Sequence, residues 1–173
     1  MDSLAYYENQ FIKADALISE GKVSEAKEIL EEILEQCPDF GKAHNHIGWI
    51  YYNKLSNYEK AIFHYKLAIK FDPKYAASYL NYTYVLVDIG RYKEAKEHIE
   101  LAFRTLENID HATYYSELGR IAELEYDYIT AHKNYSLSKK HAFNPQFLDN
   151  MDINNKRVYD KMSIFEKLKV KFK

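Results

Sequence analysis

The chain has 173 residues, of which 47% are apolar and 29% are charged, and its formal net charge is −2. This balance is ordinary for a single globular domain, and it argues against a disordered chain and against a strongly basic nucleic-acid-binding surface. No stretch approaches 18 apolar residues, and the single cysteine, Cys37, allows no intramolecular disulfide, so neither a membrane span nor a disulfide framework is expected.

Helices are expected along the whole chain, because only five glycines and three prolines interrupt it. The expected helices span residues 3–20, 23–36, 41–54, 58–71, 75–89, 92–106, 112–125 and 128–142. Asn144 and Pro145 then have the pattern of an N-cap and first turn, which predicts a ninth helix of about 24 residues. Apolar side chains recur along it at Phe147, Met151, Val158, Met162, Phe165 and Phe172.

The end of this ninth helix is basic. From residue 156 to residue 173 there are seven Lys or Arg residues against Asp160 and Glu166, a net charge of +5. One interpretation is a solvated outer face on a helix that covers the last hairpin of a stack. The other is a basic amphipathic surface that docks on a membrane or on an acidic partner.

Small and large residues recur at a nearly constant period. Ala26, Ala61, Ala95 and Ala131 are separated by 35, 34 and 36 residues. A second column holds small residues, at Ala14, Gly48, Thr83 and Gly119, and a third holds large ones, at Leu30, Tyr65, Ile99 and Tyr135. Because helix faces recur every three to four residues, these columns predict buried stripes where helices touch. A period near 34 residues is typical of stacked helical hairpins.

The pattern resembles the tetratricopeptide repeat, a helix–turn–helix unit. The best-matching segment, residues 41–75, carries Ile47-Gly48, Tyr51, Ala61, Tyr65, Ala68 and the closing Asp72-Pro73. The resemblance implies four repeats within residues 1–145, at about 7–40, 41–75, 76–109 and 112–145, followed by an amphipathic capping helix at 146–173. The implied fold is all-α: a right-handed superhelical solenoid of antiparallel helix hairpins, with about nine helices.

The resemblance also implies a binding groove, since in this family the first helix of each hairpin lines a concave surface. Helical periodicity places Phe11, Asp15 and Ile18 there from the first hairpin. The later hairpins contribute Asn45, Trp49, Tyr52, Asn53, Leu80, Asn81, Tyr84, Asp88, Ser116, Arg120 and Glu123. The lysines and arginine with which some relatives clamp a chaperone's C-terminal carboxylate are missing, so that specificity is not expected.

Trp49, the only tryptophan, stands out among these residues. Between Tyr52 and Tyr84 it has the composition of a binding hot spot, and the competing interpretation is that it belongs to the core of the stack. The sequence therefore favours a scaffold or adaptor that binds a peptide or helix of a partner protein. The alternative is a small chaperone or inhibitor dedicated to one client.

No catalytic or metal site is expected. The histidines lack ligand spacing, and no phosphate-binding loop or nucleophile motif is present in the sequence. We therefore expect no enzyme activity, no cofactor and no bound metal. An RNA-binding role would need a basic groove, whereas the predicted groove is mixed in charge. Because the N-terminal residues have no basic stretch followed by an apolar run, a cytoplasmic protein is expected.

Overall fold

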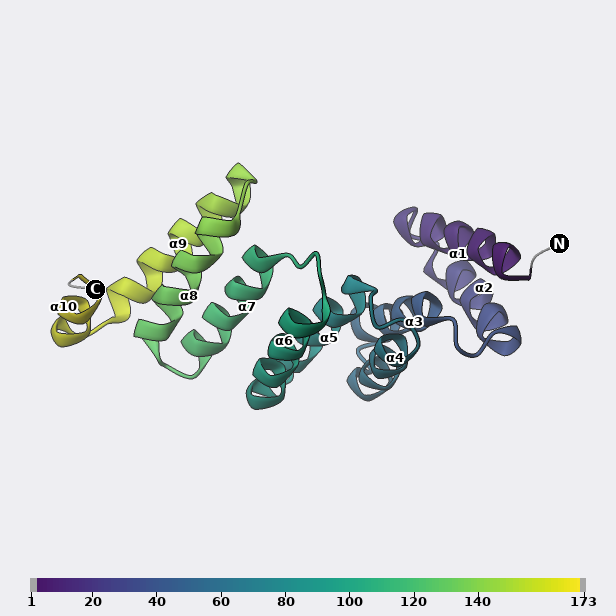
Figure 1. The fold of residues 1–173 in the computed structure, drawn as a ribbon, viewed down its shortest axis with the longest axis horizontal. Coiled ribbons are helices and arrows are strands. Elements are labelled where there is room, and N and C mark those ends of the chain that lie inside the picture. Colours follow the sequence, from purple (N-terminus) through teal and green to yellow (C-terminus); the bar gives the residue numbers. More distant parts are fainter. Residues whose placement is uncertain (1–2, 172–173) are drawn as a thin grey trace. The chain divides into compact units, whose positions relative to one another are not determined.

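The computed structural model describes residues 3–171, and every regular element in that range is an α-helix (Figure 1). The helices are α1 (Ser3–Ser19), α2 (Val23–Gln36), α3 (Gly41–Asn53), α4 (Tyr58–Phe71), α5 (Ala76–Asp88), α6 (Tyr92–Thr105), α7 (His111–Leu124), α8 (Tyr128–His141), α9 (Pro145–Lys161) and α10 (Ile164–Lys171). None of them is long and apolar enough to cross a membrane. The all-helical class expected from the sequence is confirmed.

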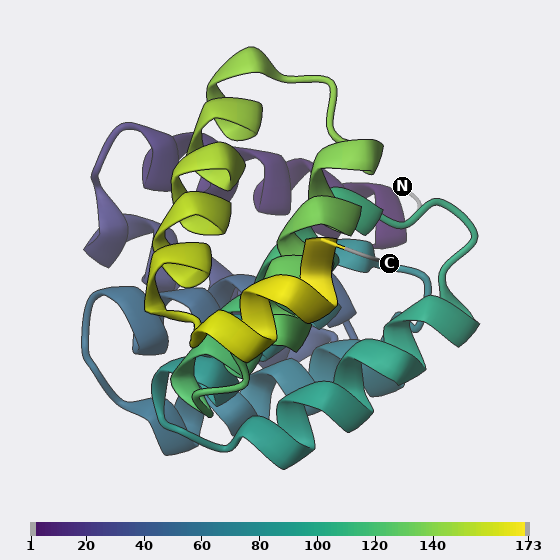
Figure 2. The same cartoon turned by 90° about the vertical axis from the view of Figure 1, so that its left-hand side faces the viewer.

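The chain divides into two compact units, residues 1–107 and residues 108–173, and each is described by itself. Unit 1 contains three hairpins, α1–α2, α3–α4 and α5–α6. Unit 2 contains the hairpin α7–α8, with α9 packed against α8 and followed by α10 (Figure 2). Within unit 1 the first helices lie next to one another, α1 beside α3 and α3 beside α5, so their inner faces form one surface.

Local capping explains where several helices begin. The side chains of Asn57, Asp110, Asp127 and Asn144 each accept a hydrogen bond from the backbone N–H three residues further on, at the start of α4, α7, α8 and α9. Such caps satisfy N–H groups that have no partner inside the helix. The turn after α1 needs Gly21, whose φ of +80° lies in the left-handed region.

The repeated columns are buried, as predicted. Ala26, Ala61, Ala95 and Ala131 are all fully inaccessible to solvent. The small column marks close helix contacts: a Cβ atom placed on Gly48 would lie 2.8 Å from the Tyr65 ring, and one on Gly119 would lie 2.6 Å from the Tyr135 ring. Each pair joins the first helix of a hairpin to the second, α3 to α4 and α7 to α8. A glycine opposite a buried tyrosine therefore fixes how closely the two helices approach.

The prediction of a single long ninth helix was wrong. The structure has two helices here, α9 and α10, and ten helices in the described part of the chain. The break follows from a capping box. The Ser163 hydroxyl and backbone N–H both donate to the Glu166 carboxylate, while Glu166 N–H donates to Ser163 Oγ at 3.3 Å. These bonds start a new helix after Met162 instead of continuing the old one.

The apolar face expected on the ninth helix is correspondingly shorter. Met151, Val158 and Met162 are buried, and Met151 and Val158 belong to one core cluster with residues of α7 and α8. Phe165 is 79% exposed, because the break turns it away from that core. Phe172, which the expected face included, lies outside the described residues.

Candidate functional site

The predicted groove residues of α3 and α5 contact each other across the inner face of unit 1. Asn81 Nδ2 donates to Asn45 Oδ1 at 3.0 Å, and the Tyr52 hydroxyl donates to the Asp88 carboxylate. Asn45 is itself buried, with 3% of its surface exposed. The hydrogen bond from this buried amide therefore orients the Asn81 side chain. Asn81 itself lies on α5 one helical turn before the buried Val85.

Trp49 lies on the same face of α3 and is partly buried. Its ring packs against a cluster of buried residues of α1, α2 and α3 and the turn between α2 and α3, and the Lys54 ammonium lies 5.4 Å from the ring centroid. This first core cluster consists of Ala14, Ala26, Leu30, Ile33, Phe40, Ala43, Ile47 and Ile50. Asn53 Nδ2 donates to the Trp49 carbonyl oxygen at 3.1 Å. On α5, Leu80 and Tyr84 are half-buried. Trp49 thus combines core packing with an accessible edge, which is compatible with both interpretations of this residue.

Helix α1 is joined to this surface by contacts with His46 of α3, a residue that was not among the predicted groove residues. His46 Nε2 lies 2.9 Å from Asp15 Oδ1, and the Phe11 ring meets the His46 ring edge-on at 4.6 Å. Phe11 and Ile18 also pack against the first core cluster. His46 could have been predicted from its position one residue after Asn45. At that position the helical period directs its side chain toward α1 rather than α5.

Arg120 and the other predicted residues of α7 belong to unit 2. Arg120 Nη1 donates to Glu117 Oε2 at 3.3 Å, and both side chains line a cavity of about 590 Å³. The cavity is lined by Ser116, Glu117, Arg120, Glu123, Leu124, Tyr126, Tyr128, Tyr135, Asn154, Arg157 and Lys161. Since Asn154, Arg157 and Lys161 come from α9, that helix forms one wall of this cavity in addition to packing against α8.

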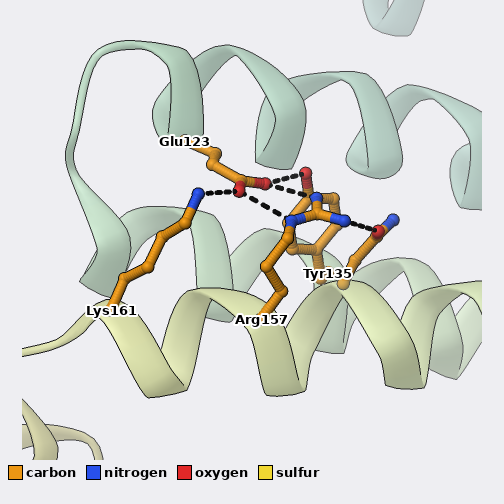
Figure 3. Close-up of polar contacts among 5 residues, drawn as sticks. Glu123, Tyr135, Arg157 and Lys161 are labelled. Carbon is orange, nitrogen blue, oxygen red and sulfur yellow. Dashed lines mark hydrogen bonds and ion pairs between the residues drawn. The ribbon is translucent and has the colours of Figure 1, made fainter.

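Glu123 is the centre of the polar contacts in this cavity (Figure 3). Its carboxylate accepts hydrogen bonds from Arg157 Nε at 2.8 Å, Arg157 Nη2 at 2.6 Å, Lys161 Nζ at 2.9 Å and the Tyr135 hydroxyl at 3.0 Å. Arg157 Nη1 also donates to Asn154 Oδ1. Hydrogen bonds from Arg157, together with those from Lys161 and Tyr135, lower the pKa of Glu123 to about 2, although its burial acts in the opposite direction.

We expect Glu123→Gln to lower the free energy of unfolding by about 1–2 kcal/mol at pH 7, less than the pKa shift alone suggests, because water screens the half-exposed Arg157 and Lys161. The folded pKa lies below the value of an unfolded glutamate. The stabilisation is therefore present above about pH 4.5 and is lost as the pH falls toward 2. Urea unfolding across this pH range measures both quantities. A matched change at the exposed Glu100 should leave stability unchanged, and equal losses would contradict the assignment.

No group of three or more described His, Cys, Asp or Glu side chains could hold a metal ion. His44 and His64 approach at 3.0 Å between their Nδ1 atoms, and His44 Nε2 bonds the Pro38 carbonyl oxygen. Burial lowers the pKa of both histidines, that of His64 to about 4.

The Cys37 thiol is half-buried and donates to Asp39 at 3.2 Å, and burial raises its pKa, so it is a protonated structural thiol.

Comparison with known proteins identifies the repeat. The family model of the tetratricopeptide repeat matches residues 7–40 and 41–75. Cell division cycle protein 27 homolog A of Arabidopsis thaliana is 36% identical over 64 residues, which make up 37% of this chain and 9% of the length of that protein. The similarity to this plant protein therefore concerns a short segment of it.

Several solved structures share the helical-repeat fold over most of the length of this chain. PilF of Pseudomonas aeruginosa superimposes with a TM-score of 0.72 and 17% identity, covering 89% of this chain and 73% of PilF. YrrB, a tetratricopeptide repeat protein with an unusual peptide-binding site, gives a TM-score of 0.69 and 16% identity, covering 88% of this chain and 75% of YrrB. At such identities the likeness shows the fold alone.

Proposed function

Since this chain is a tetratricopeptide repeat protein, whose fold is that of a protein-interaction scaffold, we propose that it binds a peptide or helical segment of a partner protein. The proposed surface in unit 1 is the inner face of α1, α3 and α5. One observation carries the proposal: polar and aromatic side chains of these three helices meet on a single surface around the partly accessible Trp49.

Two features of this surface suit a peptide. Asn81 is held in place by the buried Asn45, and such a fixed amide can pair with the backbone of a bound segment with little loss of side-chain entropy. Trp49 and Tyr52 supply aromatic area of the kind that dominates binding energy in protein interfaces. In unit 2 a separate candidate surface is the cavity lined by Arg120 and Arg157.

We expect Trp49→Ala to weaken binding of the partner segment about tenfold to a hundredfold, because an aromatic anchor at the centre of an interface loses its buried area. Proteins captured from cells on the wild-type chain and on the variant would be compared quantitatively. The dissociation constant of a segment retained only by the wild type would then be measured by calorimetry.

The control is Phe63→Ala, which removes an aromatic side chain that is 59% exposed on α4 of the same hairpin. This variant should bind the segment like the wild type. If Trp49→Ala lowers the unfolding temperature while each folded molecule binds unchanged, then Trp49 is a core residue and the proposed surface is incorrect.

A further inference from the structure

A second cavity lies on another surface of unit 2, between α8 and α10. Its volume is about 620 Å³, and it is lined by Ile129, His132, Lys133, Ser136, Leu137, Lys140, Lys169 and Val170. Helix α10 has no buried residue, so it stands against α8 without filling the space between them. The cavity is separate from the one around Glu123, with which it shares no lining residue.

The charged side chains that line this cavity are all lysines. Lys133, Lys140 and Lys169 line it, and no aspartate or glutamate does. None of these three lysines has an ion-pair partner among the described residues. Burial lowers the pKa of His132, so the positive charge at neutral pH comes from the lysines.

Two other lysines of unit 2 form ion pairs. Lys161 donates to Glu123, and Lys139, adjacent to Lys140 in the sequence, pairs with Asp152 of α9. Glu166 on α10 accepts hydrogen bonds from Ser163 and also interacts electrostatically with Lys169. Lys133, Lys140 and Lys169 therefore place three ammonium groups at one cavity, and the charge of Lys169 also acts on the nearby Glu166.

The walls between these lysines are apolar. Ile129 and Leu137 of α8 face the space together with Val170 of α10. Pockets that take small molecules have volumes of about 300–1,000 Å³, mostly apolar walls and a few charged groups that orient the ligand. The cavity fits that description, whereas a partner helix, about 10 Å in diameter, needs a longer open groove.

We propose that this cavity binds a free long-chain fatty acid. The apolar chain lies between α8 and α10 against Ile129, Leu137 and Val170, where it is removed from water. The carboxylate lies at the rim and accepts charge-assisted hydrogen bonds from Lys133, Lys140 or Lys169. The ligand supplies the negative charge that no lining residue provides, and it fills the space that α10 leaves open.

The test is titration of the full-length chain with oleate below its micellar concentration, followed by calorimetry and by displacement of a fluorescent fatty acid. We expect one oleate per chain. Oleyl alcohol, which has the same chain without the charge, should bind at least about tenfold more weakly. Lys133→Gln combined with Lys140→Gln should weaken oleate binding by a similar factor. Ser136→Trp, which fills the cavity and keeps the lysines, should abolish it.

The matched control is Lys74→Gln combined with Lys93→Gln, which changes the net charge equally at exposed lysines of unit 1 and should leave oleate binding unchanged. Equal binding of oleate and oleyl alcohol, or equal effects of the two double variants, would overturn the proposal. So would a chain that binds vesicles of anionic phospholipid but not monomeric oleate, because the basic surface would then be a membrane contact.

Discussion

Replacing Ala61 by leucine should lower the free energy of unfolding of unit 1 by about 3 kcal/mol or more, because the added atoms have no space. Ala61 is fully buried on α4. Its carbonyl oxygen lies 3.3 Å from the position that a Cβ atom on Gly48 would occupy, so the backbones of α3 and α4 approach closely at this point. Inserting a larger side chain there forces the two helices apart and removes Tyr65 from its packing against Gly48.

The measurement is urea unfolding followed by fluorescence, since the only tryptophan, Trp49, lies in unit 1 and reports on that unit. The matched control is Ala76→Leu, at an exposed position in the first turn of α5, which should change stability little. An Ala61→Leu variant that unfolds at the same urea concentration as the wild type would show that the assigned contact between α3 and α4 is incorrect.

Deleting residues 146–173 should partly unfold or aggregate unit 2, because the deletion removes Met151 and Val158 from the core cluster they form with α7 and α8. The buried Ala131 and Tyr135 would then face water, and Tyr135 would remain next to a Glu123 that has lost Arg157 and Lys161. Exposed apolar surface of this kind promotes association.

A shorter deletion, of residues 163–173, provides the control. It removes α10, which has no buried residue, and keeps α9 in place, so stability should remain close to that of the wild type. Circular dichroism and light scattering measure the helix content and the aggregation of both variants. If the longer deletion leaves a stable monomer with the helix content of an intact α7–α8 hairpin, α9 is not needed to cover unit 2.

The hairpins and their buried columns could be predicted from the sequence because they depend on local periodicity. A small residue such as Ala61 or Ala95 recurs at a constant distance from large apolar residues on the same helical face, and this spacing specifies which face is buried. The contacts between α3 and α5, of Asn45 with Asn81 and of Tyr52 with Asp88, were not predicted as pairs, but they join residues at equivalent positions of successive repeats.

The break after α9 shows where local signals compete. The apolar spacing from Met151 to Phe165 favours one continuous helix, whereas the capping box of Ser163 and Glu166 favours a new start. The structure follows the capping box. The capping pattern, a serine with a glutamate three residues later, is present in the sequence. Whether it would end the helix despite the apolar pattern could not be predicted without knowing that the core ends at Met162.

The sequence by itself determined the helical hairpins and their buried alanines, because these follow from helical period and repeat length. Only the tertiary structure decided that Glu123 of α7 binds Arg157 of α9 at 34 residues' separation, and that three lysines of α8 and α10 surround one cavity. These arrangements depend on how α9 and α10 pack beside α8. That packing is set by the three-dimensional fit of side chains, for which neither helical period nor spacing along the chain is sufficient.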